Sequence, residues 1–119
     1  MGLFHVPARL TGPTGRTESL DLPVDTGATF LVVPWAVAER LDLRATRNCP
    51  IQTADGREAS WPLAEVRLAL GGAEITTPCL VSASGPALLG AVGLESFLLA
   101  PDPVAKRLVP VKGFVYAAA

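Results

Sequence analysis

The residues of this chain that can do acid–base chemistry are its carboxylates. The single histidine, His5, excludes a multi-histidine metal site, and Cys49 and Cys79 match no metal-ligand spacing. No serine lies in a Gly-x-Ser-x-Gly turn, and no phosphate-binding glycine loop occurs. The stretch VDTGATFLVVP, residues 24–34, places Asp25 between two apolar runs. An ionised carboxylate in such a segment is costly unless something compensates for it, so Asp25 is the first candidate for a functional residue.

The elements that must position Asp25 are mostly strands. Alternating residues broken by a glycine- and proline-rich turn predict a β-hairpin that leads into the Asp25 segment. Asp-Gly between two extended runs predicts a second hairpin, with both turn residues at positive φ. The pattern predicts strands over residues 2–10, 18–24, 30–33, 49–54, 57–70, 73–82 and 107–111, and short helices over 35–41 and 94–99.

Three motifs in a fixed order carry a family resemblance. The Asp-Thr-Gly sequence at residues 25–27 and the apolar run after it resemble the active-site loop of aspartic proteases of the retroviral (retropepsin) type. In that family an apolar-apolar-glycine motif packs beside the loop and a hairpin flap covers the cleft; residues 88–90 (Leu-Leu-Gly) and 51–63 match these parts. The longer pattern VDTGAT, VP, AERLDL, TADGR, LLGAVGLE, DP and RLVP is similar to small prokaryotic, single-domain retropepsin-like (clan AA) proteins, from Val24 to Val111.

The resemblance implies a fold and an assembly. It implies a mainly β protein: a single-lobe retropepsin-like acid-protease barrel with one or two short helices, assembling as a C2 homodimer. The protease domain is expected over residues 1–112, and residues 113–119 form a C-terminal tail, either a dimer strand or disordered.

A single copy of the motif means half of an active site. Hydrolysis by water needs one group to take a proton from the water and one to protonate the carbonyl, and two carboxylates in contact do this by sharing one proton. No other aspartate is followed by Thr-Gly or Ser-Gly, and 119 residues are too few for a two-lobed enzyme. We therefore expect Asp25 of each protomer to meet at a twofold axis.

The resemblance also assigns roles to individual residues. Thr26 is expected to brace the two loops across the dimer, Gly27 to let substrate backbone approach, and Ala28 to support the carboxylate through its N–H. Trp61 lines a pocket, or is a core or flap-stiffening residue, while Asp102 bonds turn amides. The expected catalytic residues are Asp25, Thr26 and Gly27, and the expected substrate-binding residues are Gly27, Ala28, Thr53, Ala54, Asp55 and Gly56.

The composition of the chain limits the classes of binding partner that we expect. Half of the residues are hydrophobic and the mean hydropathy is +0.39, an apolar excess that fits a covered subunit face. A net charge of −1 gives no electrostatic case for nucleic acid or an anionic membrane surface. The richest apolar run, residues 30–38, contains Pro34, and the first nine residues lack a signal-peptide pattern. We expect a cytoplasmic homodimer with free cysteines, a peptide or protein substrate, and no metal or cofactor.

Two other interpretations stay open at this point. The hairpin tip carries Asp55, Arg57 and Glu58 where viral flaps are rich in glycine. This charged tip favours a weakly active or inactive retropepsin-fold module for homodimerisation or peptide binding. In the third interpretation the chain is a monomeric β-barrel fragment in which Asp25 only caps a loop.

Overall fold

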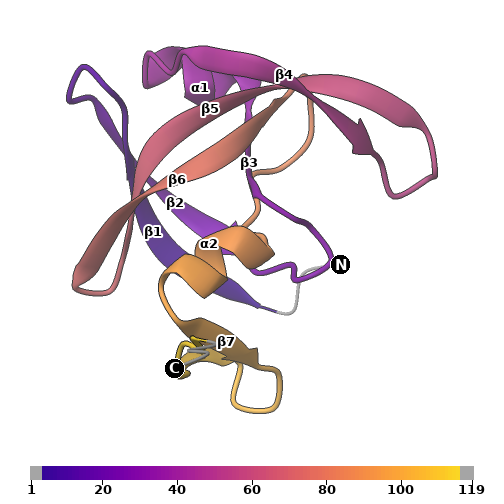
Figure 1. The fold of residues 1–119 in the computed structure, drawn as a ribbon. Helices are drawn as coiled ribbons and strands as arrows, with labels where there is room; N and C mark the ends of the chain where they lie inside the picture. The colour runs from indigo at the N-terminus through magenta and orange to yellow at the C-terminus, as the bar shows by residue number, and fades with distance from the viewer. Residues whose placement is uncertain (1–3, 116–119) are drawn as a thin grey trace.

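A computed structural model of the chain describes residues 4–115. The described part is mainly β with two short helices, in the order shown in Figure 1. The strands are β1 (His5–Thr11), β2 (Thr17–Pro23), β3 (Leu31–Pro34), β4 (Ala45–Gln52), β5 (Glu58–Leu70), β6 (Ala73–Ser82), β7 (Leu99–Asp102) and β8 (Arg107–Pro110). The helices are α1 (Trp35–Arg40) and α2 (Ala91–Ser96). The mainly β fold class expected from the sequence is confirmed.

Six of the strands form one sheet with the order β2-β1-β5-β6-β3, and β4 pairs with β5. All of its pairs are antiparallel except β3 with β6, which run parallel with Leu31 opposite Cys79. The parallel pair brings the segment after Asp25 beside the end of β6. Strands β7 and β8 form a separate two-stranded ribbon near the C-terminal end of the described chain (Figure 1).

The core follows from the alternation of the strands. Inward positions of β1, β2, β5 and β6 carry leucine, valine and alanine, and α1 and α2 add their apolar sides. A second, smaller cluster of Val32, Cys49, Leu63 and Leu80 lies apart from this core. Phe30, Ile51, Trp61 and Leu88 pack against it and are partly buried. The smaller cluster joins the hairpin β4–β5 to the loop that follows β2.

The hairpin β4–β5 reaches away from the rest of the molecule (Figure 1). The hairpin predicted at Asp55-Gly56 is confirmed. The predicted two-residue turn, with both residues at positive φ, is wrong. Gly56 has a φ of 86°, whereas Asp55 does not lie at positive φ. The Gly56 amide donates to the Thr53 carbonyl and the Thr53 amide to the Arg57 carbonyl, so three residues form the loop. The Asp55 side chain stabilises this longer turn by accepting hydrogen bonds, as described below.

The C-terminal third differs most from the sequence-based expectation. The helix predicted over residues 94–99 is found at residues 91–96, and strand β7 was not predicted. Helix α2 begins earlier because the amides of Ala91 and Val92 donate to carbonyls of Ala28 and Thr29, a contact between distant segments. Prolines disfavour central strands, but β7 has only β8 as a neighbour, so Pro101 is tolerated there.

The expected boundary between domain and tail stays a prediction. The last strand ends at Pro110, and residues 111–115 are exposed and have no regular secondary structure. Residues 1–3 and 116–119, which belong to the expected first strand and tail, lie outside the described residues.

Candidate active site

The Asp25 loop is fixed by backbone hydrogen bonds to residues far away in the sequence. Val24, fully buried, forms a parallel bridge with Leu89. The Asp25 amide donates to the Leu89 carbonyl at 2.9 Å, and the Leu89 amide donates to the Pro23 carbonyl at 2.8 Å. The predicted packing of Leu88-Leu89-Gly90 beside the loop is therefore observed. Leu89 bonds the end of β2 and Asp25 on one side, and the Val24 amide donates to the Phe4 carbonyl on the other.

Gly90 makes the closest crossing in this region. A Cβ atom at Gly90 would lie 2.4 Å from the Phe30 carbonyl oxygen and 2.7 Å from that of Ala28. Both are backbone atoms, so they cannot turn away as a flexible side chain would. The loop and the start of α2 can approach this closely only because residue 90 has no side chain.

The Asp25 carboxylate is partly buried and lies at the rim of a cleft. The Gly27 amide donates to its Oδ1 at 3.0 Å, whereas the Ala28 amide donates to the Asp25 main-chain carbonyl at 3.1 Å. The amide of Gly27 therefore supports the carboxylate, and the amide of Ala28, to which the resemblance assigned that support, bonds the main chain of the same residue. A Cβ at Gly27 would sit 3.2 Å from the same Oδ1, so a side chain there would crowd the carboxylate.

The cleft has a volume of about 680 Å³ and lies between the Asp25 loop, the β4–β5 hairpin and the end of β6. Its walls are mostly apolar and include Phe30, Val32, Ile51 and Trp61. Of the residues that line it in the described part of the chain, only Asp25 carries a charge. Such a cleft suits an extended chain with apolar side chains, presented to one acid–base group.

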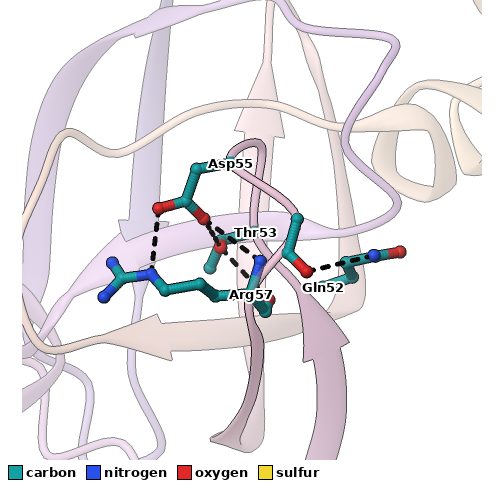
Figure 2. Close-up of polar contacts among 5 residues, drawn as sticks. Gln52, Thr53, Asp55 and Arg57 are labelled. Carbon is teal, nitrogen blue, oxygen red and sulfur yellow. Dashed lines mark hydrogen bonds and ion pairs between the residues drawn. The ribbon is translucent and has the colours of Figure 1, made fainter.

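The hairpin tip closes on itself through its own side chains (Figure 2). The Asp55 carboxylate accepts hydrogen bonds from the Thr53 hydroxyl and from the Arg57 amide, and it pairs with the Arg57 Nε at 2.9 Å. The Gln52 side-chain amide donates to the Gly56 carbonyl at 3.3 Å. Hydrogen bonds from Thr53 and then from the Arg57 amide lower the pKa of Asp55, which is exposed. The tip is therefore an ordered, charged turn.

The structure brings most of the predicted site residues to the cleft. Asp25, Gly27, Ala28, Thr53 and Ala54 line it. The exposed residues Thr26, Asp55 and Gly56 do not. Thr26 is one residue from the carboxylate and faces solvent, where a second chain could reach it.

Some cleft residues were missed or left undecided by the sequence. Trp61 combines both of its open roles, since it packs on the smaller cluster and also lines the cleft. Ser82 and Leu80 were not singled out, although their alternation at the end of β6 places both on one strand face. Asp102 has the turn role expected of it, because its Oδ1 accepts the amides of Val104 and Ala105.

The two cysteines lie outside the acid–base chemistry of Asp25. Cys49 and Cys79 are both buried and unpaired, and burial raises the pKa of the Cys79 thiol to about 12. Within residues 4–115, no cluster of three or more potential metal ligands occurs. In the same range, no helix has the length and apolar character needed to cross a membrane.

Comparisons with known proteins agree with this geometry. The sequence profile described as aspartyl protease matches residues 6–95. The protease of simian foamy virus (mac), solved in solution, has 26% sequence identity and a TM-score of 0.53, with 72% of this chain and 86% of that chain covered. The protease of EIAV, solved with the inhibitor HBY-793, has 21% identity and a TM-score of 0.62, with 88% of this chain and 90% of that chain covered, and shows likeness of fold. No curated protein sequence matches.

Proposed function

Because this chain belongs to the aspartyl protease family and is retropepsin-like, we propose that it cleaves peptide bonds as a homodimer. The observation that carries the proposal is the position of Asp25. Its loop is fixed by Leu89 and Gly90, its carboxylate lines a cleft suited to a peptide, and the chain contains no second Asp-Thr-Gly. A second copy supplies the second carboxylate.

The two Asp25 carboxylates act as one acid–base unit. Like charges a few ångströms apart do not both ionise, so the pair holds one proton. The ionised carboxylate takes a proton from the attacking water while the protonated one gives its proton to the carbonyl oxygen of the substrate. The carboxyl group that took the water proton then gives it to the nitrogen of the tetrahedral intermediate, and the C–N bond breaks. The other carboxylate takes the proton of one hydroxyl of the intermediate as the new carbonyl forms. The reaction consumes one water and leaves the dyad in its starting protonation state.

The peptide lies extended between the Asp25 loop and the β4–β5 hairpin. Thr53 and Ala54 line the cleft from the hairpin side, and the open backbone near the tip can pair with an extended peptide as an added strand does. Gly27 leaves room beside the carboxylate for the substrate backbone. The hairpin is thus the flap of this site, and its movement admits the substrate.

A dimer also accounts for exposed apolar side chains. Trp35, Leu98, Phe114 and Val115 are between 46% and 93% exposed in the single chain. Thr26, exposed beside Asp25, is the residue that braces the two loops across the axis.

The test is cleavage of a mixed peptide library between about pH 4 and 7, the range in which a carboxylate dyad holds one proton. The wild-type protein should cut peptides, and the Asp25→Asn variant should sediment as the same dimer yet cut none. Retained cleavage by that variant excludes the proposed chemistry, and a strict monomer at micromolar concentration excludes the shared site.

A second candidate function follows from the ordered tip. The Asp55–Arg57 pair and the Thr53 hydrogen bonds stabilise one turn, which favours a homodimeric module that binds peptides without turnover. An intact dimer that binds library peptides but cuts none at any pH would support this candidate.

A further inference from the structure

A buried hydroxyl without a partner lies on the floor of the cleft. Ser82 is 2% exposed, and its Oγ has no hydrogen-bond partner among the described residues. The other oxygen in this condition there, Glu18 Oε2, belongs to a carboxylate whose Oε1 pairs with Arg40 at 2.8 Å. Within residues 4–115, Ser82 is therefore the buried polar residue whose side chain makes no hydrogen bond. It also lines the cleft that contains Asp25.

The local structure explains why the protein does not satisfy this hydroxyl itself. Ser82 is the last residue of β6 and lies opposite Pro34 of β3, which has no N–H to donate. Alternate residues of a strand share a face, so Ser82 faces the same side as Leu80 of the smaller apolar cluster. Val32, Trp61 and Leu88, which also line the cleft, have side chains with no acceptor oxygen.

A buried hydroxyl with no partner is unfavourable, and alanine at this position would avoid the loss. A partner that arrives with the substrate removes the penalty. A serine hydroxyl both donates and accepts, and rotation about χ1 turns it among three staggered positions. Because Ser82 lines the cleft, a bound substrate is the source of such a partner. No cationic residue lines the cleft, and an ion would lose its hydration between its mostly apolar walls, so a neutral partner is favoured.

We propose that Ser82 forms a subsite that selects a neutral side chain with a hydroxyl or amide group, such as threonine, over its apolar isostere. The inference rests on the proposed function, since it deepens the recognition of peptides by the same cleft. A site built to hydrogen-bond a substrate group discriminates against the analogue that lacks it, because its own polar group is then left unpaired. Ser82 is thus a specificity residue and takes no part in the chemistry.

The experiment uses synthetic peptides in which each position in turn is threonine or valine, two side chains of similar shape. At one position the wild-type dimer should have a kcat/KM about 5- to 10-fold higher for threonine. The Ser82→Ala variant should lose this preference while its thermal midpoint stays the same or rises. Ser19→Ala, which removes an exposed hydroxyl on β2 outside the cleft, should keep the preference.

Two readouts separate this inference from the proposed function. Binding of the same peptide pairs to the Asp25→Asn dimer measures recognition without cleavage. If the wild type cuts nothing but the dimer binds threonine peptides better in a Ser82-dependent way, the proposed chemistry fails and the subsite stands. Equal threonine-to-valine ratios for wild type and Ser82→Ala, or no binding by either, overturn the subsite. A fall in the thermal midpoint of Ser82→Ala also overturns it, because the hydroxyl would then already have a structural partner.

Discussion

The Asp25 loop and the hairpin tip face the same cleft but are stabilised in opposite ways. The loop is held by backbone hydrogen bonds to residues 89–92, more than 60 positions away in the sequence, with Gly90 packed against its carbonyls. The tip is held by backbone and side-chain hydrogen bonds within residues 52–57, all a few positions apart in the sequence. The loop therefore cannot move without disturbing the core, whereas the tip can change shape or charge while the core stays as it is.

This difference suits the proposed chemistry. Acid–base groups must stay within a fraction of an ångström of their working geometry, and rigid support from the core provides that. A flap must admit a substrate and release products, so its stability has to be local and small. The predictions below test whether the two regions are as independent as their contacts indicate.

The largest effect should come from Gly90→Ala. The added Cβ would meet two backbone oxygens at 2.4 and 2.7 Å, so the loop or the start of α2 must shift. We expect a loss of about 3 kcal/mol in the free energy of unfolding, measured by urea denaturation. Gly72→Ala is the matched control, since nothing lies within 4 Å of its Cβ position and its φ is not positive, and it should be neutral. A Gly90→Ala protein as stable as wild type would show that the loop is not fixed by this crossing.

Features fixed by local contacts could be predicted from the sequence, whereas features fixed by contacts between distant segments could not. The hairpin at Asp55-Gly56 and the turn role of Asp102 are local features and were predicted, although the turn at Asp55 is longer than expected because its carboxylate binds Thr53 and Arg57. The start of α2 was misplaced because the carbonyls of Ala28 and Thr29, far away in the sequence, fix it. The pairing of the Asp25 loop with Leu89 was inferred from the family resemblance, since local pattern alone carries no signal for it.

The residues of the candidate site also differ in how far the sequence could predict them. Asp25 was predictable because a carboxylate between apolar runs is unusual and its motif is known. The role of Ser82 was not, because one serine at the end of a strand has no distinctive neighbours in the sequence. Its burial and the proline opposite it depend on the parallel pairing of β3 with β6.

A smaller, local effect is expected from Asp55→Asn. The change weakens the bonds to Thr53 and Arg57 without touching the core, so tip amides should exchange hydrogen about fivefold faster. The thermal midpoint should move by less than about 2 °C, because the site is exposed. Asp21→Asn on β2 makes the same change of charge elsewhere and should leave tip exchange unaltered. Faster exchange in the Asp25 loop as well would contradict the independence of the two regions.

Acid should loosen the tip in the same way. The pKa of Asp55 is lowered by hydrogen bonds from Thr53 and from the Arg57 amide, so the carboxylate stabilises the folded turn at pH values above its ordinary range. That stabilisation is lost as the pH falls through the lowered pKa. Tip amides of the wild type, corrected for the intrinsic pH dependence of exchange, should lose protection as the pH falls below the ordinary range of an aspartate, about pH 4. Asp55→Asn should show no such step, and an identical step in both proteins would assign the change to other carboxylates.

The smallest expected effect is a difference in alkylation rate between the two thiols, because Cys79 lies in the core and Cys49 lies in the β4–β5 hairpin. Cys79 lies in the core on β6, and burial raises its pKa to about 12, so at pH 8 only roughly 10⁻⁴ of it is thiolate, the form that reacts. Cys49 lies at the base of the hairpin and lines the cleft. Iodoacetamide at pH 8 should therefore label Cys49 first, measured by mass spectrometry of peptides, and Asp55→Asn should leave the rate at Cys79 unchanged. Equal labelling of both thiols would mean that the core opens together with the hairpin, and the flap would then lack the local freedom that its contacts indicate.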